Sequence, residues 1–254
     1  MPRAARTGRG DAVLPRFLAP DAGPDADRVR LPEDEAHHLA RVLRLGIAAR
    51  VAIFDGRGGE WEGRVATLDR TGVTVALDRP VDPVAEPGVR LTLAVGLLKG
   101  AQMDAIVADA TALGVRAIVP IASAHVSLPP RAWKSGGARE RWRRVAVAAA
   151  KQCGRAVVPD IRPVAAFDEV LAAAGDELIV MALEPAAGDL PALGMASPPA
   201  AAFALVGPEG GWAAGEIARA AARGAHGIRL GPRRLRADTA PTVLLSALWT
   251  RWGW

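Results

Sequence analysis

The chain has 254 residues and a single cysteine, Cys153, which excludes an internal disulfide and a cysteine-rich zinc site. No apolar run reaches the length of a membrane span, and the arginine-bearing first ten residues lack the apolar core of a signal peptide. The histidines form no metal pattern, because His37 and His38 are adjacent and adjacent side chains on a helix point about 100° apart. We therefore expect a cytoplasmic protein with no bound metal and no membrane contact.

Lysine is scarce as well, since only three of the 32 basic residues are lysine and the rest are arginine. Against 27 acidic residues this gives a formal net charge of +5 and an isoelectric point of about 10.5. A basic chain favours a polyanionic partner, and arginine suits phosphate because its planar guanidinium donates paired hydrogen bonds. Part of the arginine bias can instead reflect the base composition of the genome.

The first third of the chain is rich in strand signals. Residues 1–12 are small and basic without periodicity, so we expect a disordered extension there. Residues 13–80 predict a small β-rich barrel with a short helix opening at Glu33. Its clearest strands, separated by glycine-bearing hairpin turns, are at 51–55, 60–68 and 72–77. Residues 81–90 contain prolines and little apolar periodicity, which is typical of a linker.

The pattern changes in residues 91–254 to strands alternating with helices. Leu91 to Leu98 is a continuous apolar run, as expected for a strand that is buried on both faces. The next helix and the strand Val115 to Ile121 complete a β-α-β unit. A helix over about 138–153 should bury Trp142, Val145 and Ala149. This alternation predicts an α/β domain with roughly five or six mainly parallel strands.

Two polar loops near the carboxyl end are the best candidates for a ligand site. Gly207-Pro208-Glu209-Gly210-Gly211 and Gly231 to Ala240 each follow a predicted strand and lead into a helix. Such loops form a ligand site at one edge of a parallel sheet, and glycine lets the backbone approach a ligand closely. Neither loop matches a triphosphate-binding loop or a dinucleotide fingerprint. The alternative is that both are only tight connections.

Basic side chains gather in two places outside these loops. Arg41 and Arg44 form one group, and a basic helix over 138–155 carries Arg143, Lys151 and Arg155. A basic helix is most often a solvated face, whereas the high isoelectric point favours contact with RNA phosphates.

Six blocks of residues then occur in order over nearly the whole chain. They are His37-His38-Leu39 with Arg41-Val42-Leu43-Arg44, Lys99-Gly100 with Met103-Asp104, Ala110-Thr111-Ala112-Leu113-Gly114-Val115, Gln152-Cys153-Gly154-Arg155, Gly207-Pro208-Glu209-Gly210-Gly211, and Leu230-Gly231-Pro232-Arg233-Arg234-Leu235-Arg236. Together they resemble the bacterial 16S ribosomal RNA uracil-N3 methyltransferase family, which modifies uridine 1498. Two departures are Asp238, where the family commonly has glutamate, and Gln102, where a basic residue is common.

The resemblance implies the fold and the partners. We expect a PUA-like barrel followed by a SPOUT-type α/β domain, a mainly parallel sheet whose carboxyl end is threaded into a trefoil knot. S-adenosyl-L-methionine would be the methyl donor, 16S rRNA in the 30S subunit the substrate, and a homodimer the working assembly. Trp249, Trp252 and Trp254 would belong to the core or the subunit interface.

The resemblance also suggests roles for single residues. Arg236, and with it Arg155, would stabilise negative charge on the uracil as the methyl group arrives, and Asp238 or Glu209 would accept the proton. The cofactor would be held by the two loops and the end of the preceding strand, that is by Leu183, Glu184, Gly207, Pro208, Glu209, Gly210, Gly211, Leu230, Gly231, Leu235 and Arg236. RNA would be held by Arg41, Arg44, Lys99, Arg143, Lys151 and Arg155.

Two rival interpretations stay open at this point. One is a related methyltransferase that acts on another RNA. The other is a non-catalytic RNA-binding or assembly factor that keeps the fold, which would bind RNA but no methyl donor.

Overall fold

The computed structural model describes residues 14–127, 136–194 and 197–254. The disorder expected for residues 1–12 lies outside the described residues. The chain divides into two compact units between Val84 and Ala85, within the segment 81–90 that the sequence predicts as a linker. Each unit has a hydrophobic core of its own.

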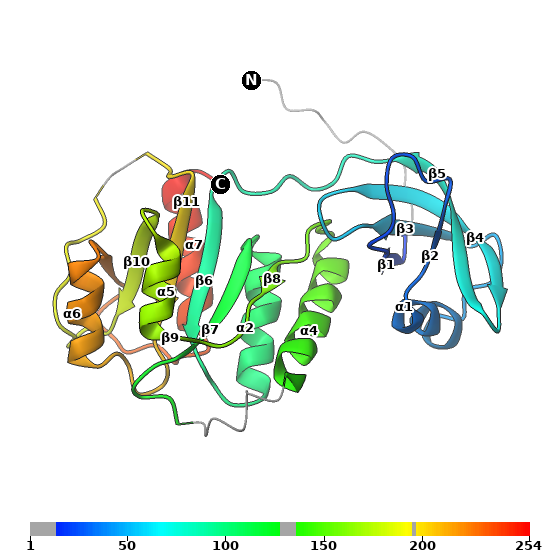
Figure 1. Ribbon diagram of the computed structural model, residues 1–254. Helices are drawn as coiled ribbons and strands as arrows, with labels where there is room; N and C mark the ends of the chain where they lie inside the picture. The colour runs from blue at the N-terminus through cyan, green and yellow to red at the C-terminus, as the bar shows by residue number, and fades with distance from the viewer. Residues whose placement is uncertain (1–13, 128–135, 195–196) are drawn as a thin grey trace. The chain divides into compact units, whose positions relative to one another are not determined.

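The smaller unit is a five-stranded sheet in the order β1-β3-β4-β5-β2 (Figure 1). Its strands are β1 (Arg16–Leu18), β2 (Arg28–Arg30), β3 (Arg50–Phe54), β4 (Glu60–Asp69) and β5 (Gly72–Pro80). The pairs β3–β4 and β4–β5 are antiparallel hairpins, whereas β1 runs parallel to β3. The Asp55 carboxylate organises the first hairpin turn, because its Oδ1 accepts from three successive N–H groups at 2.7–3.0 Å, those of residues 57–59.

One short helical segment packs on this sheet. Helix α1 (Glu33–His37) begins with three acidic residues, which the helix dipole favours, and continues as a π-helical turn, η1 (His38–Val42). Leu39 of that turn is fully buried in the core of the unit with Phe17 and Ile53. The sequence therefore predicted this helix and the strands β3, β4 and β5 correctly.

The larger unit is built on a parallel sheet in the order β12-β10-β11-β6-β7-β8, with β9 pairing to β7. Its strands are β6 (Arg90–Gly96), β7 (Ala117–Ala122), β8 (Asp160–Ile161), β9 (Ala165–Ala166), β10 (Leu178–Leu183), β11 (Ala201–Val206) and β12 (His226–Arg229). Every residue of β11 is buried, and so is every residue of β6 after Arg90. The two central strands are thus covered on both faces, as their unbroken apolar runs predict.

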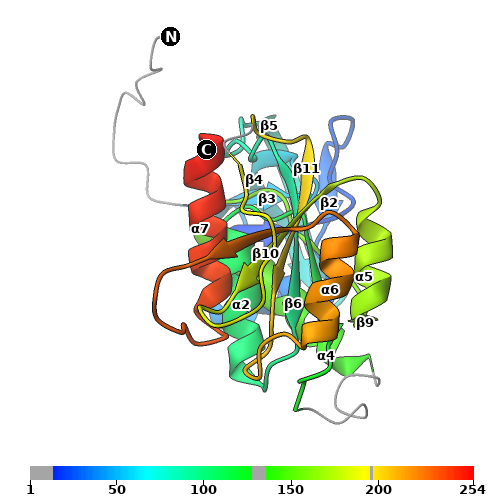
Figure 2. The same ribbon diagram turned by 90° about the vertical axis from the view of Figure 1, so that its left-hand side faces the viewer.

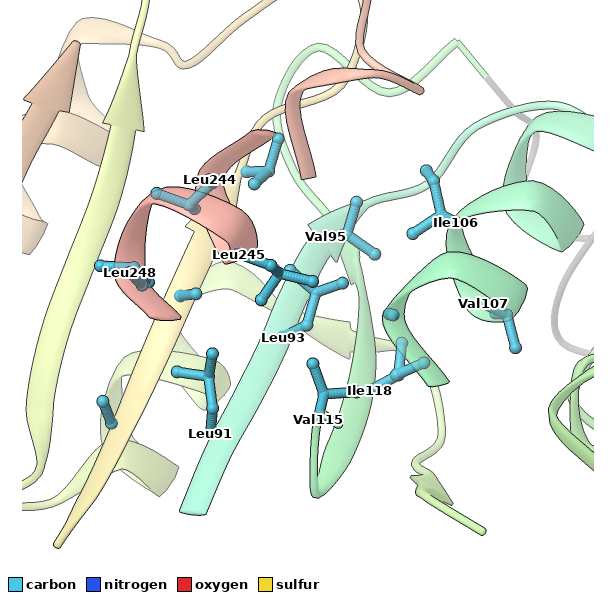
Figure 3. Packing of buried hydrophobic residues seen from close by; sticks show 14 of the residues in the cluster. Leu91, Leu93, Val95, Ile106, Val107, Val115, Ile118, Leu244, Leu245 and Leu248 are labelled. Carbon is cyan, nitrogen blue, oxygen red and sulfur yellow. The ribbon is translucent and has the colours of Figure 1, made fainter. Parts of the chain in front are cut away.

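Helices cover both faces of this sheet. They are α2 (Ala101–Ala112), α4 (Gly137–Cys153), α5 (Phe167–Ala174), α6 (Ala214–Ala222) and α7 (Ala240–Trp252). Figure 2 shows α2 and α7 on one face and α5 and α6 on the other. On the first face Leu93 of β6 lies beside Leu245 of α7, and Val95 of β6 lies beside Ile106 of α2 (Figure 3).

The inward face of α4 is largely as predicted. Trp142 is buried and Val145 packs half-buried against the core, but the fully buried positions continue through Ala146 and Ala150 instead of the half-buried Ala149. The strand that follows α4 is short, because β8 contains only Asp160 and Ile161. The three tryptophans at the carboxyl end differ in burial. Trp249 and Trp252 are buried in the core, whereas Trp254 is half exposed.

Candidate functional site

A cavity of about 340 Å³ opens at the carboxyl ends of β10, β11 and β12. This is the edge at which parallel α/β sheets bind ligands. Every residue predicted to bind the cofactor lines it except Gly210. The predicted lining residues are Leu183, Glu184, Gly207, Pro208, Glu209, Gly211, Leu230, Gly231, Leu235 and Arg236. The two loops, which helix α6 and strand β12 separate along the chain, thus form one cavity.

Glycine is required where the chain segments of the cavity approach one another. Gly211 has a φ of +67°, and a Cβ there would lie 3.0 Å from an oxygen of Glu184. A Cβ on Gly96, the last residue of β6, would lie 2.4 Å from the backbone nitrogen of Pro208. Any larger side chain at these positions would push the glycine loop away from the strand ends.

Two arginines of the second loop form ion pairs. The Arg234 guanidinium donates to Glu184 at 2.5 Å across the cavity, and this hydrogen bond raises the pKa of Arg234. Arg236 donates from Nε to Asp238 Oδ1 at 3.1 Å and from Nη2 to Oδ2 at 2.7 Å. The second pair is bidentate, so it fixes the plane of the guanidinium as well as its position.

The Asp238 carboxyl is held in its ionised form. Burial raises its pKa, but this effect is outweighed by the hydrogen bonds and charge of Arg236 and by hydrogen bonds from Gln102 and Thr239, so the pKa lies below its usual value. The side chain is 19% exposed, whereas that of Arg236 is 76% exposed. Asp238 is therefore mostly covered, whereas Arg236, which lines the cavity, is open to solvent. Thr239 is the N-cap residue of α7, and no side chain caps that helix.

Sequence reasoning missed several residues that line the cavity. Gln102 comes from α2 and was predicted only as a departure from the family pattern, whereas Trp212 directly follows the glycine loop and Arg234 belongs to the second loop. The signal for Gln102 was available, because it lies at the start of the helix that follows β6 and the carboxyl ends of parallel strands meet at one edge. The Trp212 indole donates to the carbonyl of Ala182 at 3.0 Å, which ties the glycine loop to β10.

The structure corrects the assignment of Arg155 to catalysis and to RNA contact. Arg155 is 4% exposed and lies near the amino end of β7, at the opposite edge of the sheet from the cavity. Its guanidinium donates to the carbonyls of Thr111 and Val115 at 2.9 and 3.0 Å and to both oxygens of Glu86. A buried guanidinium with these partners holds the fold together and cannot reach a substrate.

The other residues predicted to bind RNA lie on surfaces. Arg41 and Arg44 are exposed in the smaller unit, and Arg44 has a φ of 53°, which is uncommon for a residue with a side chain. Lys99 is exposed three residues before Gln102, and Arg143 is exposed on α4. Lys151 is half-buried and engaged by a neighbour. Their contact with RNA stays a prediction.

Within 14–127, 136–194 and 197–254, no group of three or more His, Cys, Asp or Glu side chains could hold a metal ion. No helix in the same part of the chain has the length and apolar character needed to cross a membrane.

Comparison with known proteins decides the family. The sequence profile of the RNA methyltransferase domain matches residues 85–249, and that of the RNA methyltransferase PUA domain matches residues 31–78. The chain belongs to this family of RNA methyltransferases. The match confirms the predicted PUA-like barrel and the predicted SPOUT-type domain with its parallel sheet, whereas the trefoil knot stays a prediction.

Individual relatives agree with the family. The ribosomal RNA small subunit methyltransferase E of Synechocystis is 34% identical over 87% of this chain and 72% of its own length. The crystal structure of the enzyme of that name from Neisseria gonorrhoeae, bound to S-adenosyl methionine, has 28% identity and a TM-score of 0.83 over 94% of this chain and 98% of its own. A probable rRNA-methyltransferase from Porphyromonas gingivalis has 30% identity and a TM-score of 0.76 over 94% and 99%.

Proposed function

We propose that this RNA methyltransferase transfers a methyl group from S-adenosyl-L-methionine to N3 of a uridine of the 1498 type in 16S ribosomal RNA. The observation that carries the proposal is the cavity that joins the glycine loop to the arginine loop, with Arg236 held at its opening by Asp238. The names of the relatives support the choice of small-subunit rRNA, and the ligand of the Neisseria structure supports the choice of cofactor.

The residues of the cavity fit this cofactor. Leu183, Leu230 and Leu235 offer an apolar surface for a purine ring, and the glycine loop provides backbone at close range. The carboxylates of Glu184 and Glu209 supply negative charge, which complements a positively charged sulfonium and amino group. When bound, the cofactor supplies an electrophilic methyl group, so no nucleophilic thiol is required of the protein.

Arg236 is the residue we assign to the developing charge on the uracil. A guanidinium has five N–H donors, and the Asp238 carboxylate takes two of those of Arg236. The remaining donors can approach the O2 or O4 oxygen of a uracil that loses its N3 proton. Donors that are already oriented stabilise such charge without reorganising as it appears.

Asp238 is then a positioning residue for Arg236 and a poor proton acceptor. A carboxylate whose pKa is lowered binds a proton weakly, and both of its oxygens already accept from Arg236. Glu209 is exposed and lines the cavity, so it stays the candidate acceptor among the residues first considered.

Substrate binding follows from charge. N3 lies on the pairing edge of uracil, so the target must be unpaired or flipped out. Arg41, Arg44, Lys99 and Arg143 are exposed and can hold phosphates, which would make binding sensitive to salt. A homodimer in the cytoplasm, where the small subunit is assembled, completes the proposal.

The test is methyl transfer to 30S subunits that lack the modification, followed by nucleoside analysis. We expect 3-methyluridine at a single position of 16S rRNA. A methyl group found only on another RNA would contradict the choice of substrate. Failure to bind S-adenosyl-L-methionine in calorimetry would favour the assembly factor.

A further inference from the structure

The glycine loop is held in place from outside the cavity by a segment that sequence reasoning did not assign. We infer that His125 and Glu216 are positioning residues that fix the glycine loop, residues 207–211, in the shape that the cofactor requires. The inference rests on the proposed function, since it gives this loop the task of holding S-adenosyl-L-methionine. Neither His125 nor Glu216 lines the cavity, so each acts through the loop.

His125 bonds directly to the far side of the glycine loop. Its Nδ1 lies 3.0 Å from the carbonyl oxygen of Gly210 and 3.2 Å from that of Gly211. Both partners are acceptors only, so Nδ1 must carry the hydrogen and donate it to the pair. A single imidazole therefore holds two successive peptide groups of the loop.

The same contact explains why Gly210 is a glycine although it does not line the cavity. A Cβ on Gly210 would lie 2.7 Å from the Cβ of His125, which is closer than real side chains come. Gly210 thus provides room for His125, whereas Gly211 provides room for Glu184 on the cavity side. The glycine loop is packed on both sides, so a shift of His125 would move the loop and with it the wall of the cavity.

Glu216 ties the segment that carries His125 to the end of the glycine loop. It is 2% exposed, in the first turn of α6, where the helix dipole favours a carboxylate. Its Oε1 accepts from the N–H of Ala124 at 3.0 Å, and its Oε2 accepts from the N–H of Ala213 at 2.9 Å. Ala124 precedes His125 and Ala213 follows Trp212, so one buried carboxylate bridges the two loops.

The chain offers a matched control for this bridge. Helix α5 begins with the same local bond, from the N–H of Ala166 to Oε2 of Glu169 at 2.8 Å, but Glu169 is exposed. Glu169→Gln therefore measures the cost of weakening a helix cap alone. Glu216→Gln additionally leaves one N–H of the bridge facing an amide that cannot accept from it.

The experiment makes two measurements on the wild type and each variant. Calorimetry, well below each melting temperature, gives the affinity for S-adenosyl-L-methionine, and amide hydrogen exchange of Gly211 is followed in the cofactor-free protein. We expect His125→Leu and Glu216→Gln to raise Kd roughly five- to tenfold and to speed exchange to a similar degree, as the loss of one or two hydrogen bonds predicts. His125→Asn places an amide donor near the position of Nδ1 and should stay within about twofold of wild type, as should Glu169→Gln.

Two results would overturn the inference. One is a lower melting temperature in His125→Leu with unchanged Kd and unchanged exchange, because a merely structural contact behaves in this way. The other is an equal loss of affinity in Glu169→Gln and Glu216→Gln. If Glu216→Gln fails to fold, the two His125 variants decide. If the wild type binds no cofactor, the proposed function fails. Exchange at Gly211 then still decides whether His125 and Glu216 hold the glycine loop.

Discussion

At the carboxyl edge of the parallel sheet, the side chain of Arg236 is 76% exposed, whereas at the amino edge that of Arg155 is only 5% exposed. Both arginines make paired hydrogen bonds to a carboxylate, Asp238 in the first case and Glu86 in the second. Arg236 keeps N–H donors that can face a ligand, whereas further N–H groups of Arg155 donate to backbone carbonyls. The comparison shows that burial and remaining donors, rather than residue type or partner, separate a candidate catalytic arginine from a structural one.

Arg236→Ala should have the largest effect on catalysis. We expect kcat for methyl transfer to fall about 10²- to 10³-fold, the usual effect of removing one donor to a developing negative charge. The unfolding free energy should change by less than about 0.5 kcal/mol because the side chain is exposed. Arg229→Ala, which removes an exposed arginine paired with Asp189 outside the cavity, is the matched control in the same assay. Near-normal turnover in Arg236→Ala would remove it from the mechanism.

Arg155→Met should have the opposite profile. The variant leaves Glu86 without its partner and two backbone carbonyls without donors, so we expect a loss of about 3 kcal/mol in urea unfolding. This lies at the lower end for buried pairs because Glu86 is 35% exposed and can be hydrated again. Cofactor affinity of the folded variant should equal that of wild type. Lost affinity with intact stability would contradict the structural role.

The pKa of the Asp238 carboxyl reports on its pairing with Arg236. Its lowered pKa means that the pair with Arg236 stabilises the fold above the ordinary value of about 3.9 and that this stabilisation is lost as pH falls through the lower folded pKa. In Arg236→Ala the effect of burial stays and the largest opposing effect is gone, so the midpoint should rise from its wild-type position toward the ordinary value. Carbon-detected NMR of the carboxyl in both proteins measures this. An unmoved midpoint would show that Arg236 does not hold Asp238.

Arg234→Gln should have the smallest effect. The pair with Glu184 is exposed on the arginine side, at 62%, and exposed pairs contribute about 0–1 kcal/mol. We expect a change in cofactor affinity of less than about threefold in calorimetry. A tenfold loss would instead place Arg234 among the residues that hold the cofactor.

The sequence predicted the layout of the fold because the spacing of apolar residues and the unbroken apolar runs are local signals. The apolar run of β6, the strand β11 that precedes the glycine loop, and the two glycine-bearing loops could all be read directly from the chain. It could also place both loops at one edge, since the carboxyl ends of parallel strands meet there.

Side-chain pairing could not be predicted in the same way. Arg155 belongs to a sequence block that resembles the family, and nothing local shows that Glu86, 69 residues earlier, takes its charge in the interior. The bond from His125 to the glycine loop likewise spans 85 residues and depends on how two loops meet. Such contacts follow from tertiary packing, which hydrophobic periodicity does not encode.

Hydrogen exchange measured by mass spectrometry, with and without S-adenosyl-L-methionine, tests the central claim most directly. The account predicts that the cofactor slows exchange in peptides covering residues 183–184, 207–211 and 230–236, and leaves those around Arg155 and Glu86 unchanged. Protection at the amino edge of the sheet, or no protection in the two loops at saturating cofactor, would contradict it.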